Sequence, residues 1–410
     1  MTSERLMAIV GAGHVGGRAA QTLREAGWRG GIALIGAEAH WPYERPPLSK
    51  GLLTGKRVAA QCQLRPADAW QEDRIEHIVG RVQSFDPNAR TVQISDGRTL
   101  AYEALLLATG GHPRQLTIPG AQLEGVVALR TLDDAARIER RFVPDARVLL
   151  IGGGFIGLEV AASARARGCD VTVLEGAPRL LGRNVPASIA ARVHALHESH
   201  GVRIHLNTTP ESISQADDGT LAVTLTSGDV LAADTVIVGI GIDPADELAR
   251  DAGLRVQRGI VVDASLETSA TGVFAAGDVA LFPSRYTTQL IRQETWHNAE
   301  TQARVVARNM LGAGEAYRAL PWFWSDQYDH QLQVAGEPAL GTRSVTRPLN
   351  GDAEIHFHFD VNARLVGASG YGTASAFVKE MRLARMLVDS DKAIAPESVA
   401  DIDVPLKSLL

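Results

Sequence analysis

Two glycine clusters with the same spacing are the residues in this sequence best suited to chemistry. They are Gly11, Gly13 and Gly16 in the first G-x-G-x-x-G and Gly152, Gly154 and Gly157 in the second. In such a cluster the first glycine makes a tight turn, and the second lets backbone N–H groups approach a pyrophosphate. The third lets a helix pack on a strand, so the spacing predicts two dinucleotide sites.

The elements around each cluster are those that a dinucleotide site requires. Apolar strands are predicted at 6–10 and 147–151, helices running to Ala26 and Arg167, and further strands at 32–35 and 171–174. The pattern therefore occurs twice in one chain. It predicts an α/β fold with two Rossmann-like dinucleotide-binding domains.

An acidic residue follows the second strand of each pattern. Glu175 comes directly after the strand at 171–174, and Glu38 follows the strand at 32–35. A carboxylate there accepts a hydrogen bond from an adenosine 2′-OH and repels a 2′-phosphate. Glu175 therefore favours NADH over NADPH, and Glu38 is the candidate in the first site. The alternative for either residue is an exposed charge at a strand end.

Three other buried-strand runs end in glycine, which suits a backbone that approaches a ligand closely. The residues at these ends are Ala108, Thr109, Gly110, Gly239, Ile240, Gly241, Gly277 and Asp278. Two nucleotide sites give a redox relay only when they hold different cofactors. A flavin in one site and a nicotinamide in the other would allow hydride transfer from C4 of one ring to N5 of the other.

Composition sets limits on the class of protein. The chain has 410 residues and a net charge of −6, which suits two or three domains and gives no sign of a nucleic-acid partner. The sequence contains no run of about 18 apolar residues, so we expect no membrane-spanning helix. Cys62 and Cys169 are the two cysteines, without a Cys-x-x-Cys spacing. We therefore expect a cytoplasmic protein without a disulfide framework.

Longer motifs make the chain resemble the FAD-dependent ferredoxin reductases of bacterial oxygenase systems. These are the putidaredoxin reductase type and the reductases of aromatic-ring dioxygenases. Besides the two glycine clusters, the motifs lie at 45–50, 108–110, 129–132, 276–278, 321–327 and 404–407. Arg-Pro-Pro-Leu-Ser-Lys at 45–50 and Pro-Trp-Phe-Trp-Ser-Asp-Gln at 321–327 are the specific ones. The resemblance runs from near the first residue to the last few.

The resemblance implies three domains and a non-covalent FAD. The FAD domain is expected at 1–112 and 245–320, the NADH domain at 113–244 and an interface domain at 321–410. The residues implied for FAD, beyond the glycines and strand ends above, are Val15, Glu38, Arg45, Lys50, Val82, Arg130, Asp278, Glu294, Thr295, Trp296 and Trp322. Phe155, Ile156 and Glu159 join the second glycine cluster as residues expected near NADH. Some relatives carry an acidic residue where this chain has Ala37.

The resemblance also implies which residues act on the hydride. Lys50 would stabilise the negative charge that the flavin gains near N5 and O4. Glu159 would pair with Lys50 and hold it in place. Trp296, Trp322 and Trp324 are candidates to line the flavin and the exit surface, with core packing as the alternative.

The implied partner is a small acidic [2Fe–2S] ferredoxin that feeds a dioxygenase or a cytochrome P450. The preferred docking residues are Arg304 and Lys407, with Arg308 and Trp324 beside them; solvated helix faces are the alternative. The oligomeric state implied is a monomer or weak homodimer. Other acceptors stay open: rubredoxin, a quinone or monodehydroascorbate. A redox-signalling flavoprotein like apoptosis-inducing factor is the non-catalytic alternative.

Histidines and cysteines predict no further site. His194, His197 and His200 recur along a helix, but a zinc site needs a closed ligand set, and no metal is expected. His356 and His358 share one face of a strand and are expected at the surface. Residues 1–61 hold no cysteine, which argues against the dithiol reductases and the NADH peroxidases of related fold.

Overall fold

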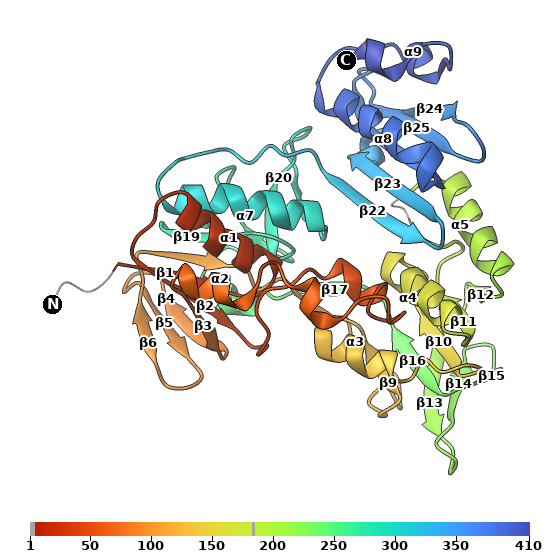
Figure 1. Ribbon diagram of the computed structural model, residues 1–410, viewed down its shortest axis with the longest axis horizontal. Coiled ribbons are helices and arrows are strands. Elements are labelled where there is room, and N and C mark those ends of the chain that lie inside the picture. Colours follow the sequence, from red (N-terminus) through yellow and green to blue (C-terminus); the bar gives the residue numbers. More distant parts are fainter. Residues whose placement is uncertain (1–4, 183–184) are drawn as a thin grey trace. The chain divides into compact units, whose positions relative to one another are not determined.

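The computed structural model describes residues 5–182 and 185–410 (Figure 1). The first four residues of the predicted FAD domain lie outside the described residues. The chain divides into two compact units. Unit 1 comprises 1–46, 59–112 and 242–319, and unit 2 comprises 47–58, 113–241 and 320–410. The division into three functional domains stays a prediction.

Unit 1 is built on a five-stranded parallel sheet in the order β19-β7-β1-β2-β3. The strands are β1 (Leu6–Val10), β2 (Gly31–Gly36), β3 (Ile75–Val79), β7 (Ala104–Leu107) and β19 (Val273–Ala275). The apolar runs of β1, β2, β7 and β19 are buried, as expected for parallel strands covered on both faces. Parallel strands end at the same edge, so the loops after β1, β2, β7 and β19 meet there.

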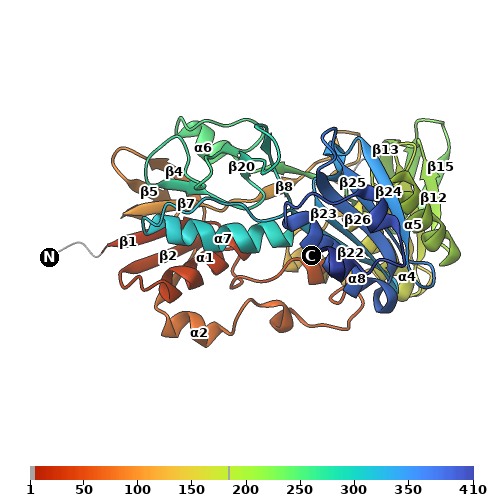
Figure 2. The same cartoon turned by 90° about the horizontal axis from the view of Figure 1, so that it is seen from above.

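Two helices of unit 1 pack side by side against this sheet. They are α1 (His14–Glu25) and α7 (Trp296–Met310), which Figure 2 shows along each other. The antiparallel strands β4 (Val82–Asp86), β5 (Thr91–Ile94) and β6 (Thr99–Ala101) form a separate sheet. The remaining elements are η2 (Ala59–Cys62), α2 (Ala67–Glu72), β17 (Ile242–Pro244), α6 (Glu247–Asp251), β18 (Ile260–Val261), β20 (Ala280–Pro283) and β21 (Leu290–Ile291).

Unit 2 repeats the parallel architecture in the order β12-β11-β10-β16-β9. These strands are β9 (Val126–Ala128), β10 (Arg147–Ile151), β11 (Asp170–Glu175), β12 (Arg203–Leu206) and β16 (Thr235–Val238). The helices are α3 (Leu132–Glu139), α4 (Phe155–Ala166) and α5 (Ala187–Ser199). A three-stranded antiparallel sheet joins β13 (Pro210–Gln215), β14 (Leu221–Leu225) and β15 (Val230–Ala233). The predicted pair of Rossmann-like sheets is thus confirmed.

The last part of unit 2 is a five-stranded antiparallel sheet in the order β22-β23-β26-β25-β24. It contains β22 (Trp322–Gln327), β23 (His330–Gly336), β24 (Arg343–Pro348), β25 (Glu354–Phe359) and β26 (Leu365–Thr373). Helix α8 (Ala374–Asp389) packs on β23 and β26 (Figure 2). The chain ends with α9 (Pro396–Ala400) and η4 (Leu406–Leu409), after η3 (Pro338–Leu340). Two short elements, η1 (Pro46–Ser49) and β8 (Gly111–Pro113), run from one unit into the other along the chain.

One prediction about this sheet is wrong. His356 and His358 were expected at the surface, but each is only 8% exposed. His358 lies 3.1 Å from Ser369 Oγ, and His356 lies 3.1 Å from Thr346 Oγ1 and 3.4 Å from Ser188 Oγ of α5. The alternation of His and Phe in β25 indicated one solvated face, whereas both faces of the strand are covered.

Apolar side chains from several segments form the cores. In unit 1 the core joins β1, β2, β7 and β19 with α1 and α7. In unit 2 one cluster joins α4 and α5 with Leu332, Val334 and Tyr371 of the C-terminal sheet. The second parallel sheet and the C-terminal sheet therefore share buried side chains within unit 2. Among the described helices, none is long and apolar enough to cross a bilayer.

Candidate functional site

The first glycine turn lies where β1 ends beside β7. Gly11 has φ +115°, and a Cβ on it would lie 2.1 Å from the carbonyl oxygen of Ala108. A Cβ on Gly16 would lie 1.9 Å from the carbonyl oxygen of Gly11, so α1 starts directly against the turn. Only glycine permits this close approach of backbones. The first and third glycines thus have the structural roles that their spacing predicts.

The start of α1 is left open for a ligand. A Cβ on Gly13 would meet nothing nearer than Arg45 Nη2, at 3.9 Å. Gly13 is also the N-cap residue of α1, and no side chain caps the helix there. Uncapped N–H groups and the positive end of the helix dipole favour a phosphate. The turn therefore fits the pyrophosphate of the predicted flavin dinucleotide.

Glu38 lies after β2, close to this open turn. Its Oε2 accepts a hydrogen bond from Tyr43 Oη at 2.5 Å, and its Oε1 lies 3.2 Å from Arg45 Nη2. Arg45 in turn reaches toward Gly13. The structure thus brings Glu38, Arg45 and the first glycine cluster together. The assignment of Glu38 to the adenosine ribose stays a prediction.

The turn after β19 lies against the same helix. Gly277 has φ +83°, and a Cβ on it would lie 2.5 Å from Val15 Cγ2. Gly277 N–H donates to Oε1 of Gln302, a fully buried residue of α7. Sequence reasoning missed Gln302, because a glutamine on a helix gives no signal of what it faces. Gln302 thus holds the turn that carries Asp278, which is predicted to bind the ribityl chain of FAD.

The other flavin candidates of unit 1 lie on several elements. Thr109 Oγ donates to the carbonyl oxygen of Ala245 at 2.7 Å, and Gly110 follows with φ +68°. Thr295 caps α7 by accepting from Asn298 N, and Trp296 is the first residue of that helix. Glu294 lies 2.6 Å from Arg292, and Val82 begins β4. Their contact with a flavin stays a prediction.

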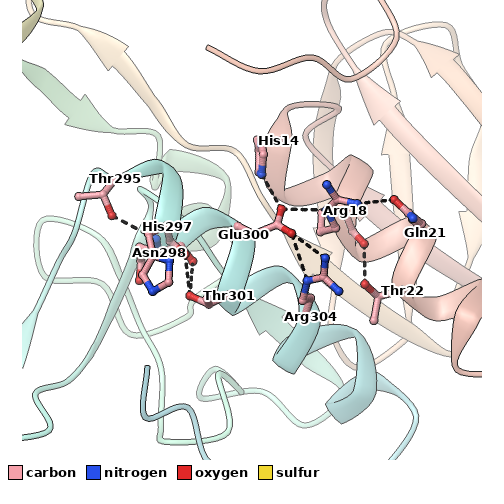
Figure 3. Close-up of polar contacts among 10 residues, drawn as sticks. All are labelled: His14, Arg18, Gln21, Thr22, Thr295, His297, Asn298, Glu300, Thr301 and Arg304. Atoms are coloured by element: carbon pink, nitrogen blue, oxygen red, sulfur yellow. Dashed lines mark hydrogen bonds and ion pairs between the residues drawn. The ribbon is translucent and has the colours of Figure 1, made fainter. Parts of the chain in front are cut away.

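A charged cluster joins α1 to α7 (Figure 3). Glu300 Oε2 lies 2.9 Å from His14 Nε2 and accepts from Arg18 Nε at 2.8 Å, while Oε1 accepts from Arg304 Nη2 at 2.8 Å. Burial raises the pKa of Glu300, but the hydrogen bonds from His14, Arg304 and Arg18 outweigh it and lower the pKa to about 2. Arg304, predicted to dock the partner, is therefore also held by Glu300.

The second glycine turn, in unit 2, has the same geometry. Gly152 has φ +108°, and a Cβ on it would lie 2.5 Å from the carbonyl oxygen of Gly239. A Cβ on Gly157 would lie 2.2 Å from the carbonyl oxygen of Gly152. Gly154 has no neighbour within 4 Å of its Cβ position and begins α4 without a side-chain cap. This open helix start fits the second pyrophosphate.

Other candidates for the nicotinamide dinucleotide surround this turn. Glu175 ends β11 and accepts hydrogen bonds at 2.7 Å from the N–H groups of both Gly153 and Ala177. Its carboxylate thus lies beside the turn, where an adenosine ribose is expected. Ile156 is 50% exposed on the first turn of α4, and Phe155 packs edge-on against Phe323.

The strand next to this turn also ends in glycine. Gly239 follows β16 and lies against Gly157, with 3.6 Å between its Cβ position and Gly157 Cα. Ile240 packs on the core, and Gly241 has φ +100°. The turns after β10 and β16 therefore lie at one edge of the second parallel sheet, together with Glu175 at the end of β11.

The predicted pair of Lys50 and Glu159 is present in unit 2. Lys50 Nζ lies 3.2 Å from Glu159 Oε1 and 3.3 Å from Asp326 Oδ2. Glu159 is 4% exposed, and it accepts hydrogen bonds from Ser49 Oγ at 2.5 Å and Ser325 Oγ at 2.6 Å. Burial raises the pKa of Glu159, while Lys50 and the two hydroxyl groups act in the opposite direction.

The tryptophans of β22 lie beside this lysine. Lys50 Nζ is 6.0 Å from the centre of the Trp324 ring, and Trp324 stacks on Trp322 at 5.1 Å. Arg385 of α8 lies over Trp322 at 4.6 Å. Arg130, the remaining flavin candidate of unit 2, lies between β9 and α3, and its N–H donates to Asp134. The flavin-lining roles of Trp322, Trp324 and Arg130 stay predictions.

The predicted docking cations have exposed side chains. Arg308 of α7 pairs with Glu315 at 2.7 Å and keeps 39% of its side chain exposed. Lys407 lies exposed on η4, in unit 2. Arg304 keeps 46% of its side chain exposed despite its pairing. These cations are accessible to a partner, and their docking role stays a prediction.

Sequence reasoning missed several polar residues of the site. They are His14, Arg18, Ser49, His197, Glu300, Gln302, Ser325 and Gln327. Ser49, Ser325 and Gln327 lie inside the two specific motifs, so their position was a usable signal. His197 was considered as a metal ligand, but its Nε2 lies 2.9 Å from Gln327 Oε1. Long-range contacts of this kind leave no local pattern in a sequence.

The fold and both open glycine turns define a two-dinucleotide oxidoreductase. Residues 6–303 match the family described as pyridine nucleotide-disulphide oxidoreductase, and residues 322–410 match the reductase C-terminal family. The chain belongs to the pyridine nucleotide-disulphide oxidoreductase family. Neither of its cysteines fits the disulphide chemistry in that name, because Cys62 and Cys169 are both buried, one in unit 1 and the other in unit 2.

The known proteins to which this chain is similar include reductases of small electron-transfer proteins. The ferredoxin–NAD(+) reductase component of the anthranilate 1,2-dioxygenase system of Burkholderia cepacia is 41% identical over 98% of both chains. Rubredoxin-NAD(+) reductase of Pseudomonas putida is 41% identical over 80% of this chain and 86% of its own. A solved covalent complex of putidaredoxin reductase with putidaredoxin matches with a TM-score of 0.93, 35% identity and coverage of 100% and 98%.

Proposed function

We propose that this chain is an NADH-dependent ferredoxin reductase of an oxygenase system. The observation that carries the proposal is the similarity over 98% of both chains to a reductase component named for ferredoxin and NAD(+). The predicted cofactors are a non-covalent FAD and NADH, which the two open glycine turns fit. Without a redox-active cysteine pair near either turn, the electrons must leave for a separate acceptor.

Each predicted site contributes binding or electrostatics rather than acid–base chemistry. FAD held at the first glycine turn would supply two-electron chemistry with a nicotinamide and one-electron chemistry with the acceptor. Glu175 selects the dinucleotide without a 2′-phosphate. Lys50, held by Glu159 and Asp326, supplies a fixed positive charge where negative charge develops. The helix starts at Gly13 and Gly154 hold the two pyrophosphates.

The finer features of the partner and of the protein are also part of the proposal. We propose an acidic [2Fe–2S] ferredoxin as the partner, because the candidate docking residues Arg304, Arg308 and Lys407 are cations with exposed side chains. The terminal oxygenase would be a dioxygenase or a cytochrome P450. A monomer or weak homodimer and a cytoplasmic location stay predictions from the sequence.

The test is NADH-driven reduction of cytochrome c by the purified yellow protein, with and without a [2Fe–2S] ferredoxin. We expect a large ferredoxin-dependent rate, and a much lower rate with NADPH. A parallel assay with rubredoxin tests the second candidate acceptor, which the 41% identical rubredoxin reductase favours. If the rate depends on rubredoxin and not on ferredoxin, rubredoxin replaces ferredoxin as the proposed acceptor. A long-lived charge-transfer species with slow turnover would instead favour the redox-signalling alternative.

A further inference from the structure

A line of buried hydrogen bonds runs from α5 to Glu159, all of it within unit 2. His197 of α5 is fully buried, and its Nε2 lies 2.9 Å from Gln327 Oε1. Gln327 Nε2 donates to Ser325 Oγ at 2.9 Å, and Ser325 Oγ donates to Glu159 Oε1 at 2.6 Å. We call these four residues the His197 chain. It ends at the carboxylate that pairs with Lys50.

The donors of the His197 chain all point toward Glu159. A carboxylate only accepts, so the single proton of Ser325 Oγ is directed to Glu159, and the hydroxyl oxygen accepts from Gln327. The amide of Gln327 then presents only its oxygen to His197. The imidazole must therefore donate from Nε2, which requires a proton at that nitrogen. In the neutral ring Nδ1 is then an acceptor, and Tyr328 Oη lies 3.5 Å from it.

We infer that His197 is a positioning residue for Lys50: through Gln327 and Ser325 it orients the hydroxyl donor that keeps Glu159 ionised and paired with the lysine. This inference rests on the proposed function, because it concerns the lysine assigned to the hydride step. His197 itself touches neither Lys50 nor a reacting atom. Its contribution is the direction of the donors, which reinforce one another in a low-dielectric interior.

The environment of Glu159 makes this orientation consequential. Burial raises the pKa of Glu159 above its ordinary value, and Lys50, Ser325 and Ser49 offset only part of that rise. Losing a donor would raise the pKa further, and a protonated Glu159 would give Lys50 no negative partner. The second partner of Lys50, Asp326, is 41% exposed and holds it less firmly.

His197 and the tyrosine beside it keep the same protonation state around pH 7. Burial, helped by the nearby imidazoles of His200 and His194, lowers the pKa of His197 to about 4 against the opposing effect of the hydrogen bond to Gln327. Tyr328, stacked on His200 at 3.7 Å, has its pKa raised by burial to about 12. His197 and Tyr328 therefore stay neutral around pH 7, so the direction of the chain is fixed across the working range.

The test combines a readout of the chain itself with one of flavin reduction. Histidine-selective ¹⁵N NMR of the holoenzyme is expected to show His197 as the neutral Nε2–H form at pH 7. Infrared pH titration, with Glu159→Gln to assign the band, reports protonation of Glu159. Stopped-flow bleaching of the flavin by NADH reports the hydride step without any acceptor protein.

Two substitutions at one position separate orientation from packing. His197→Leu removes the donor and is expected to slow flavin bleaching about tenfold and to raise the pH at which the Glu159 carboxyl band disappears. His197→Gln places an amide N–H near the same site. This variant should keep the native bleaching rate and the native pH of the Glu159 transition. His194→Leu, on the same helix but outside the chain, is the matched control and should change neither.

The outcomes decide the inference either way. An Nδ1–H or protonated His197 at pH 7 would overturn it, and so would equal effects of His197→Leu and His197→Gln. If His197→Leu does not fold, Ser325→Ala must raise the pH of the Glu159 transition, or the inference fails. Bleaching that depends on His197 in a protein that reduces no ferredoxin would support the inference while refuting the proposed function.

Discussion

At the residue scale, Lys50 carries the electrostatic part of the proposed chemistry. Replacing it with methionine removes the positive charge but keeps most of the apolar stem. We expect Lys50→Met to slow flavin bleaching by NADH on the order of 10²-fold, the usual cost of a lost electrostatic stabiliser. Stopped-flow absorbance measures this rate. Lys56→Met, at an exposed lysine of the same loop, is the control and should keep the native rate.

Glu175 is expected to decide between NADH and NADPH. Its carboxylate lies at the second glycine turn, where it would repel a 2′-phosphate. Glu175→Ala combined with Gly176→Arg should lower the ratio of kcat/KM for NADH over NADPH by at least about tenfold, or 1.4 kcal/mol. Equal use of both dinucleotides by the native protein would show that Glu175 does not discriminate.

At the scale of elements, Glu300 of α7 pairs with His14 and Arg18 of α1, and with Arg304 of its own helix (Figure 3). Its pKa is lowered to about 2 from an ordinary 4.5, so its contribution to stability is present above pH 4.5 and is lost as pH falls toward 2. Glu300→Gln should therefore cost about 2 kcal/mol near pH 7, measured by urea unfolding.

The pH dependence and a matched control make this prediction specific. The difference between Glu300→Gln and the native protein should shrink below pH 4.5, because the unfolded chain then binds a proton at Glu300 while the folded protein keeps this carboxylate ionised until about pH 2. Glu315→Gln breaks the exposed pair with Arg308 and should cost less than about 1 kcal/mol. If both substitutions lower the free energy of unfolding equally, the α1–α7 cluster stabilises the protein no more than an exposed ion pair does.

The elements could be predicted further than their contacts. Both glycine turns, their strands and their helices follow local rules, so the expected helix ends at Ala26 and Arg167 fall within one residue of the observed ones. The pairing of Lys50 with Glu159 needed a family resemblance, because 109 positions separate the two residues. His197, Glu300 and Gln302 could not be placed, since a polar residue on a helix does not reveal which distant element covers it. The prediction that His356 is exposed was wrong for the same reason.

At the scale of the whole molecule, buried neutral histidines should make the protein sensitive to acid. Burial lowers the pKa of His197 and of His358 to about 4. The unfolded chain binds protons at these positions near pH 6.5 and the folded chain does not, so stability falls as pH drops from 6.5 toward 4. We expect about 2 kcal/mol from each histidine. Urea midpoints at pH 7 and pH 5 should differ less in His358→Asn than in the native protein.

The distribution of charge over the molecule sets the last prediction. The chain carries a net charge of −6, so attraction of an acidic ferredoxin must come from local cations rather than from the whole protein. Arg304→Gln and Lys407→Gln should each lower kcat/KM for ferredoxin several-fold and weaken its dependence on salt. Neutral substitutions are preferable, because a carboxylate at 304 would face Glu300 directly.

Two controls separate docking from damage to the enzyme. Flavin bleaching by NADH should be unchanged in both variants, since neither cation belongs to the predicted hydride site. Lys392→Gln, at another exposed lysine, should leave kcat/KM and its salt dependence as they are. Electrostatic steering acts mainly on the association rate and is screened over about 8 Å at physiological ionic strength. A rate with ferredoxin that ignores both substitutions and salt would place the docking surface elsewhere on the protein.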